Sequence, residues 1–193
     1  MKKQTTDTRQ HIIDVARAII THKGYSAVGL SEIVQAAGIP KGSFYYYFKS
    51  KEEFAEALLE HYFSHYLQEV DNQLSGAGTA RERLLRYFAF WKTTQGQDLP
   101  ESKCLVVKLG AEVCDRYDNM RQVLATGTQE IVHKIAGCIR LGQEDGSLPA
   151  VSDADELAEE LYQLWLGASL MAKIHDPDNA FGKAMKATTR LLG

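Results

Sequence analysis

Two groups of residues in this sequence have distinctive chemistry, and the first is a cysteine close to lysines. Cys104 lies in LPESKCLVVKL, with Lys103 next to it and Lys108 four positions later. Ammonium groups and the first turn of a helix both favour the thiolate, which is the nucleophilic form of a cysteine. Cys104 is therefore a candidate for reaction with electrophiles or oxidants. The alternative is a small buried core residue, the commonest role of a cysteine outside a disulfide.

The second group is the aromatic and cationic run KGSFYYYFKSK, from Lys41 to Lys51. Three consecutive helical residues point in directions spread over about 200°, so a neighbouring helix can cover only one of the three tyrosines. Phenolic hydroxyls and ammonium groups are donors to phosphate oxygens, and a helix N-terminus adds partial positive charge. The run predicts a surface that contacts DNA, whereas plain solvation is the alternative for Lys49 and Lys51.

Other chemistries find little support. A thiol enzyme needs a base, and none of the six histidines is recognisably paired with Cys104, so we predict no enzyme. His61 and His65 stand one helical turn apart, but the residues between them do not form H-E-x-x-H and no third ligand is evident. The three cysteines lack C-x-x-C spacing. We therefore predict no metal, no cofactor and no disulfide framework.

Composition places these groups in an ordinary water-soluble chain. It has 193 residues, of which 45% are hydrophobic, enough for one large domain or two small ones. No apolar run approaches the about 20 residues of a membrane span, so we expect a cytoplasmic protein without membrane contact. Residues 1–51 contain eight Lys and Arg against three Asp and Glu, a net charge of +5 that leaves −8 for the remainder. A basic head on an acidic body is typical of a protein that binds a polyanion.

Three helices are expected to position the tyrosines. Apolar residues recur at helical spacing over residues 12–20, in a helix that Asp7 or Thr8 can cap. Leu30–Ala37 and Pro40–Tyr47 predict two short helices joined by a turn. Phenylalanines at positions 44 and 48 fall at i, i+4 and face inward, which leaves the polar residues outward. This pattern predicts a helix-turn-helix, the unit whose second helix enters the DNA major groove.

Helices also account for the remainder of the sequence. Capping boxes at Ser50–Glu53 and Thr79–Glu82 predict the starts of a fourth and a fifth helix. Ser152 is the expected cap of the eighth. The other expected helices cover about residues 103–115, 120–144 and 177–192. No strand alternation competes with this pattern, so the predicted fold class is all-α with about nine helices.

The stretch AGIPKGSFYYYFKSKEEF, from Ala37 to Phe54, resembles the helix-turn-helix signature of the TetR family of bacterial repressors. The resemblance covers about residues 8–54, with Gly24-Tyr25 in matching register. It implies a DNA-binding domain over residues 1–50 and a larger helical domain for ligand binding and dimerisation over residues 51–193. It also implies a homodimeric repressor that leaves a palindromic operator when a ligand or a modification acts on the larger domain.

The same resemblance implies which residues contact DNA. The matching positions are Lys41, Gly42, Ser43, Tyr45, Tyr46, Tyr47 and Lys51. This sequence departs from many members of the family at Gly29, where a threonine commonly caps the second helix, and at Tyr47, where a histidine is common. Glycine is an acceptable cap but offers no side chain to a phosphate.

The last two helices carry more apolar surface than one chain of this size covers easily. Pairing two copies as a four-helix bundle would bury it, and the alternative is burial within one chain. The predicted dimerisation residues are Leu161, Leu164, Trp165, Ala168, Met171, Phe181 and Met185.

The inducer is suggested by a second resemblance. CLVVKLGAEVCD and LWLGASLMAKI are similar to segments of the TetR repressors that control reductases of electrophiles such as N-ethylmaleimide and quinones. That resemblance implies that Cys104 senses the electrophile and that Lys173 lies near its thiol. Ten residues of helix separate Cys104 from Cys114 by about 15 Å, too far for a disulfide. We interpret Cys138 as inert core and leave the role of Cys114 open.

Three other interpretations stay open at this point. A noncovalent small hydrophobic ligand could replace the electrophile as inducer. A thiol-dependent enzyme would use Cys104 as its nucleophile, and a helical scaffold protein would share the helices but bind no specific DNA.

Overall fold

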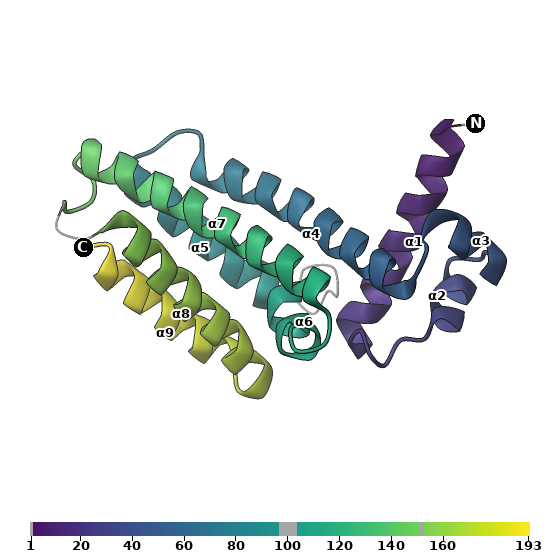
Figure 1. Cartoon of the computed structure of the whole chain (residues 1–193). Coiled ribbons are helices and arrows are strands. Elements are labelled where there is room, and N and C mark those ends of the chain that lie inside the picture. Colours follow the sequence, from purple (N-terminus) through teal and green to yellow (C-terminus); the bar gives the residue numbers. More distant parts are fainter. Residues whose placement is uncertain (1, 97–103, 151–152) are drawn as a thin grey trace. The chain divides into compact units, whose positions relative to one another are not determined.

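The structure is a computed structural model that describes residues 2–96, 104–150 and 153–193 (Figure 1). Within these residues the chain forms nine helices and no strand, which confirms the all-α prediction. The helices are α1 (Lys2–Lys23), α2 (Leu30–Ala36), α3 (Lys41–Tyr47), α4 (Lys51–Leu74), α5 (Ala80–Gly96), α6 (Leu105–Val113), α7 (Asp118–Glu144), α8 (Ala154–Ile174) and α9 (Pro177–Leu191). Among the described helices, none combines the length and the apolar character that crossing a bilayer requires.

Contacts divide the chain into two compact units, Met1–Phe63 with Leu99–Ala125 and Ser64–Asp98 with Thr126–Gly193. The first unit contains α1, α2, α3 and α6 together with the first half of α4. The second contains α5, α8 and α9 with the second half of α4 and most of α7. The domain boundary predicted at residue 50 stays a prediction, because this division groups part of α4 and α6 with the N-terminal helices.

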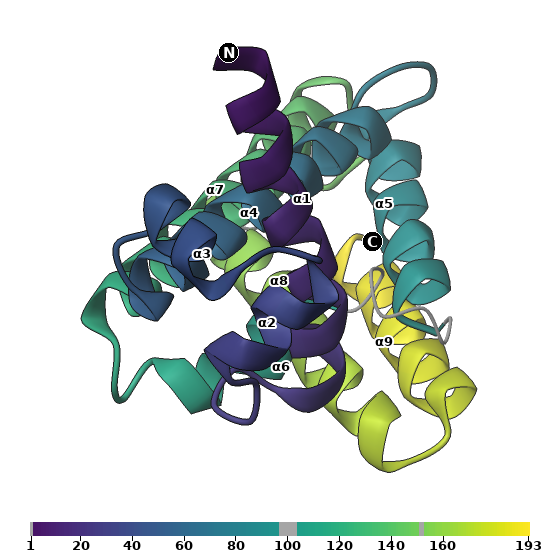
Figure 2. The same cartoon turned by 90° about the vertical axis from the view of Figure 1, so that its right-hand side faces the viewer.

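The helices α1, α2 and α3 lie together in Figure 2, and an aromatic core packs α3 against the start of α4. The ring of Phe44 lies 5.3 Å from that of Phe48 and 5.6 Å from that of Phe54, between centroids. All three rings are buried, as is Ile33 on α2. The prediction that Phe44 and Phe48 face inward is confirmed, so α3 has one buried side and one that is open to solvent.

The helix boundaries agree with the local sequence except at the start of α1. That helix begins at Lys2 and not near Asp7 or Thr8, because KKQTT contains no glycine or proline to interrupt it. At its end Gly24 has φ of 92°, in the left-handed region that favours glycine, and its N–H donates to the carbonyl of Ile20 at 2.8 Å. The chain then turns towards α2.

Both capping boxes are present. The Glu53 N–H donates to Ser50 Oγ at 3.1 Å, and the Glu53 carboxylate accepts from the N–H of Lys49 at 2.9 Å, one residue before the expected partner. At the start of α5 the Thr79 N–H donates to the Glu82 carboxylate at 2.8 Å. The Glu82 N–H donates to Thr79 Oγ1 at 3.3 Å.

The cap of α8 differs from the prediction. Asp153 holds the cap position, and its carboxylate accepts from the N–H groups of Asp155 and Glu156. The predicted cap, Ser152, lies outside the described residues. An aspartate next to the helix N-terminus also has a favourable charge interaction with the helix dipole.

Two buried tryptophans, whose indole N–H groups are both hydrogen-bonded, lie in the core of the second unit. Trp91 on α5 donates its indole N–H to Ser169 Oγ at 2.9 Å, and Trp165 donates to Thr188 Oγ1 at 2.8 Å. Phe88 stacks on Trp165 with ring centroids 5.0 Å apart. Because a buried indole N–H needs a partner, these two hydrogen bonds fix how α8 packs against α5 and α9.

Candidate functional site

The outer side of α3 presents a phenolic surface to solvent. Tyr45 and Tyr46 are 53% and 75% exposed, whereas Tyr47 is half-buried and lies edge to face with Tyr46 at 5.0 Å. Lys41 and Gly42 at the start of the helix are exposed. One of the three tyrosines is thus partly covered, as the helical geometry predicts, and two are open to a partner.

Lys51 differs from the other predicted DNA-contacting residues because its ammonium group has partners in the first unit. Its Nζ donates to the main-chain carbonyl of Tyr25 at 3.0 Å and lies 4.1 Å from the centroid of the Tyr25 ring. Burial lowers the pKa of Lys51, although the charges of Glu52 and Glu112 act in the opposite direction. A contact between Lys51 and DNA stays a prediction. The structure adds a second role, which is to brace the turn between α1 and α2.

Two further exposed cations lie near α3: Lys49, which belongs to the cationic run of the sequence, and Arg9, which was not singled out from the sequence. The guanidinium of Arg9 on α1 lies 4.9 Å from the centroid of the Phe48 ring, and Lys49 is exposed directly after α3. Only the net positive charge of residues 1–51 pointed to Arg9, because its pairing with Phe48 depends on the tertiary fold. Together with Lys41 they add positive charge around the phenolic surface.

Gly29 caps α2 with an extended backbone conformation, φ −80° and ψ 155°, and without a side-chain hydrogen bond. A Cβ atom added there would meet nothing within 4 Å. The glycine is therefore required neither by its conformation nor by its surroundings. This agrees with the expectation that it is an adequate cap that offers nothing to a phosphate.

The cysteines occupy three different environments. Cys104 directly precedes α6 and is 6% exposed, and its carbonyl accepts the N–H of Lys108 at 3.1 Å. Cys114 follows α6 and is half-buried. Cys138 is buried, donates to the carbonyl of Ala80 at 3.6 Å, and burial raises the pKa of its thiol. The inert character predicted for Cys138 agrees with this setting, and all three cysteines are outside disulfides.

Of the three lysines of the predicted sensor region, the structure describes Lys108 and Lys173. Lys103 lies outside the described residues, and the ammonium of Lys108 donates to the carbonyl of His22 at 3.1 Å. Lys173 is exposed near the end of α8. Because Cys104 belongs to the first unit and Lys173 to the second, their proximity stays a prediction.

The residues predicted for dimerisation fall into two sets. Leu161, Trp165 and Phe181 are buried within one chain, where they build the core of the second unit around the stacked rings. Leu164 and Met185 are half-buried, Ala168 is buried although it lies at the surface of the groove described below, and Met171 is 42% exposed. Leu161, Trp165 and Phe181 therefore follow the alternative to dimerisation, which was burial within one chain. Of the other four residues, Met171 is the most exposed.

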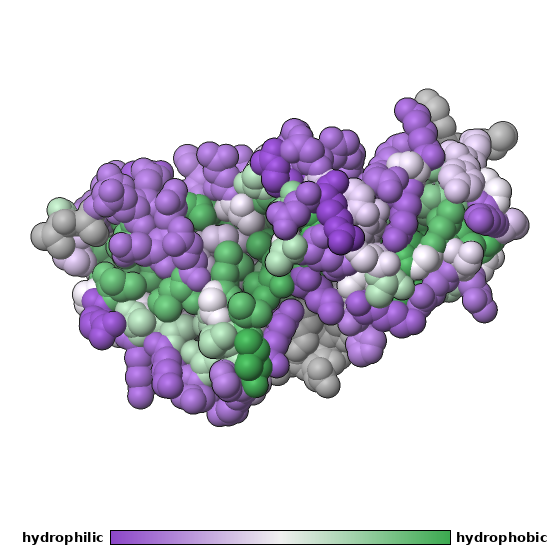
Figure 3. All heavy atoms as spheres, turned by 60° about the horizontal axis from the view of Figure 1, so that its bottom comes forward, coloured by the Kyte–Doolittle hydropathy of each residue, from purple (hydrophilic) through white to green (hydrophobic). Residues whose placement is uncertain are grey.

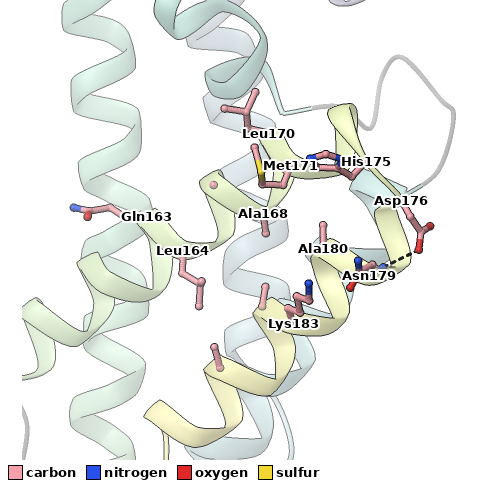
Figure 4. A pocket seen from close by; sticks show the side chains of 13 residues that line it. Gln163, Leu164, Ala168, Leu170, Met171, His175, Asp176, Asn179, Ala180 and Lys183 are labelled. Carbon is pink, nitrogen blue, oxygen red and sulfur yellow. Dashed lines mark hydrogen bonds between the residues drawn. The ribbon is translucent and has the colours of Figure 1, made fainter.

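Three residues of the second set, Leu164, Ala168 and Met171, line an apolar groove between α8 and α9 with a volume of about 620 Å³. Figure 4 shows Leu164, Ala168 and Met171 on α8 opposite Ala180 on α9. Leu170, at the same end of α8, is 48% exposed. Hydrophobic side chains gather on this face of the α8–α9 pair in Figure 3. Exposed apolar surfaces are typical of interaction sites, and dimerisation through this groove stays a prediction.

The two histidines considered as a metal pair show no metal-like cluster. In the part of the chain that the structure describes, no three His, Cys, Asp or Glu side chains come together to hold an ion. His61 lies 2.7 Å from the side-chain nitrogen of Gln10 and 3.4 Å from the carboxylate of Asp14, both on α1. His65 is exposed.

Comparison with sequence families gives two matches. The profile described as bacterial regulatory proteins of the tetR family matches residues 12–58, which include α2, α3 and the start of α4. The profile described as the C-terminal domain of tetracyclin repressor-like proteins matches residues 80–188.

Individual proteins are similar over most of the chain. The HTH-type transcriptional repressor NemR of Escherichia coli K12 is 39% identical over 176 residues, which are 90% of this chain and 88% of that protein. The transcriptional regulator AcuR of Cereibacter sphaeroides is 35% identical over 89% of this chain and 80% of its own length. The crystal structure of the reduced form of E. coli NemR superposes with a TM-score of 0.91, at 35% identity and with 97% of each chain covered.

Proposed function

Because the chain belongs to the TetR family of bacterial regulatory proteins, we propose that it is a homodimeric transcriptional repressor that an electrophile or oxidant releases from DNA through Cys104. The repressor function is that of its relatives, which are regulators of transcription. The finer statements concern the DNA-contacting residues, the dimer surface and the inducer. Each is supported by a separate feature of the structure.

The exposed phenolic surface of α3 carries the DNA-binding part of the proposal. Phe44 and Phe48 are packed in the core on the buried side of α3 and hold the helix in place. Tyr45 and Tyr46 project into solvent from the opposite side. Rigid phenols lose little conformational entropy when their hydroxyl groups donate to phosphate oxygens or base edges. Lys41 at the first turn adds a cation at the helix end that already attracts anions.

The apolar groove between α8 and α9 supports dimerisation. Leu170 and Met171 expose apolar surface that a second copy of the same pair of helices would cover as a four-helix bundle. A two-fold symmetric dimer presents two copies of α3, which fits a palindromic operator whose half-sites lie one or more helical turns apart.

The position of Cys104 supports covalent induction. The residue directly precedes the first turn of α6, where main-chain N–H groups favour an anion. With N-ethylmaleimide, the thiolate sulfur adds to the C=C bond, the C–S bond forms as the π bond breaks, and the resulting enolate takes a proton from water. Because the thiol is nearly buried, an added group must displace its neighbours and move α6. A shift of about 1–2 Å at a packed interface is enough for such switches.

Operator release by N-ethylmaleimide tests this proposal. A duplex enriched by the wild-type protein from a random library serves as operator, and binding is followed by fluorescence anisotropy before and after treatment. We expect release of wild type and of Cys114→Ser, and retention by Cys104→Ser. Release of Cys104→Ser at the wild-type rate would contradict the assignment of the sensor. Wild-type protein that keeps its operator after full alkylation would favour a noncovalent hydrophobic ligand.

A further inference from the structure

Two side chains of α6 hold the main chain of the turn between α1 and α2. We propose that Lys108 and Glu112 form a clamp through which α6 sets the position of the helix-turn-helix, so that the clamp determines operator affinity. This inference rests on the proposed function as a DNA-binding repressor. It assigns the step between the sensor helix and the DNA-contacting surface to particular residues.

The clamp holds the turn on both sides of Gly24. The ammonium of Lys108 donates to the carbonyl of His22 at 3.1 Å, in the last turn of α1. The carboxylate of Glu112, one helical turn further along α6, accepts the N–H of Tyr25 at 3.1 Å and that of Ser26 through its other oxygen. The His22 carbonyl is one of the last four of α1, which have no partner within the helix, and the two N–H groups belong to the turn itself. Movement of α6 therefore acts directly on the backbone of the turn.

Glycine at position 24 permits this close approach. A Cβ atom added to Gly24 would lie 2.9 Å from Oε2 of Glu112, so a side chain at position 24 would force the carboxylate out of its place. The φ of 92° at Gly24 also disfavours any other residue. The turn is thus shaped to admit the carboxylate.

Tyr25 links the clamp to the start of α4. Its N–H is bound by Glu112 from α6, and its carbonyl is bound by Lys51 from the first turn of α4 at 3.0 Å. Its ring is buried between the Lys51 ammonium and the ring of Tyr117, whose centroid lies 5.4 Å away. Lys51 follows α3 by only four residues. A displacement of α6 therefore reaches the first turn of α4, which directly follows α3, through Tyr25.

The charge state of Glu112 suits this role. Burial raises the pKa of its carboxyl group. The hydrogen bonds from Ser26 and Tyr25 and the charge of Lys108 lower the pKa by more than burial raises it, so the pKa lies below its ordinary value. The carboxylate is then ionised at neutral pH. Hydrogen bonds to an ionised acceptor are the stronger kind, which makes the clamp a firm connection.

The clamp and the predicted sensor occupy one side of α6. Residues 104, 108 and 112 are spaced by four, so they lie on the same face, and Glu112 is about 12 Å along the axis from Cys104. The helix has only nine residues, from Leu105 to Val113. A group attached to Cys104 that moves the first turn of so short a helix moves Lys108 and Glu112 with it.

The test compares Glu112→Gln with Glu60→Gln, which changes an exposed glutamate of α4 in the same unit. Amide hydrogen exchange at Tyr25 and Ser26 reports whether the clamp is broken, and anisotropy with the enriched duplex reports operator affinity. We expect Glu112→Gln to accelerate exchange of both amides and to weaken operator binding by about tenfold or more, a factor that corresponds to about 1.4 kcal/mol. Glu60→Gln should leave both unchanged.

Lys108→Met provides the second variant. If the two residues act as one clamp, their effects are not additive. The double variant, Lys108→Met with Glu112→Gln, should then bind the operator as weakly as whichever single variant binds it more weakly, and no more weakly than that. Faster exchange at Tyr25 and Ser26 with wild-type operator affinity would overturn the inference, and so would unchanged exchange in Glu112→Gln. A wild-type protein that enriches no duplex would instead overturn the proposed function itself.

Discussion

The ring of Tyr45 stands edge to face on the ring of Phe44, with centroids 5.7 Å apart and planes at 88°. The exposed phenol on α3 thus rests on a buried ring, and that ring in turn packs on Phe48 and Phe54. This relationship explains how a helix of only seven residues can present side chains firmly. Its stiffness comes from the aromatic core below it, since isolated helices of that length are unstable in water.

The hydroxyl group of Tyr46 gives the first test of the phenolic surface. Tyr46→Phe removes one donor from a ring that is 75% exposed, so we expect operator binding to weaken by about 1.5–3 kcal/mol, the usual range for a hydrogen bond to a charged group. Unfolding midpoints should change little, because the site is at the surface. Tyr66→Phe in the second unit is the control, and equal affinities of the two variants would contradict the assignment.

Lys41 gives a test that separates charge from shape. If its ammonium binds a phosphate, Lys41→Gln should lower the slope of log K against log salt by about 1 in magnitude, because one counterion fewer is released from DNA. The measurement is a salt titration of binding to the enriched duplex. Lys186→Gln, at an exposed position of α9, should keep the wild-type slope. An unchanged slope for Lys41→Gln would place that lysine away from the phosphates.

Local signals in the sequence were enough to predict most helices and the exposed side of α3. The spacing of Phe44 and Phe48 and the capping boxes at Ser50 and Thr79 depend on neighbouring residues only, and the structure agrees with them. The contacts of Lys51 with Tyr25 could not be predicted in this way, because they join residues from different helices.

Tertiary contacts also decide which apolar residues are accessible. Trp165 was expected at a dimer surface, but its indole reaches Thr188 and its ring stacks on Phe88, so it is core. The sequence shows that α8 is apolar on several sides, not which side its own chain covers. In the same way, nothing in the sequence near Glu112 indicates that its carboxylate would bind a turn more than eighty residues earlier, at Tyr25 and Ser26.

Thr188 is expected to contribute to stability through one buried hydrogen bond. Thr188→Val keeps the shape but removes the acceptor of the Trp165 indole N–H, which leaves a buried donor without a partner. We expect a loss of about 1–3 kcal/mol in the free energy of unfolding, measured by urea denaturation. Thr189→Val, at an exposed neighbour, is the matched control and should change stability by less than about 0.5 kcal/mol.

The lowered pKa of Glu112 predicts a pH dependence with a definite sign. Its folded-state pKa lies below the ordinary value of 4.5, so the ionised carboxylate stabilises the fold fully above that value. The contribution is lost as the pH falls below 4.5 and through the folded-state pKa. The difference in unfolding free energy between wild type and Glu112→Gln should be constant from pH 7 to about 5 and should shrink in more acid solution. A difference that grows on acidification would contradict the assigned hydrogen bonds.

Met171 tests the dimer surface. Met171→Glu places a carboxylate at the apolar groove between α8 and α9, where a second copy would have to desolvate it, so we expect a shift from dimer to monomer in sedimentation equilibrium. Leu141→Glu, at an exposed position of α7 that does not line this groove, should remain dimeric. Operator affinity should fall only in the Met171 variant, since a monomer cannot bind both half-sites together and loses the gain from linked binding. Dimers of unchanged stability in Met171→Glu would move the interface to another face of the second unit.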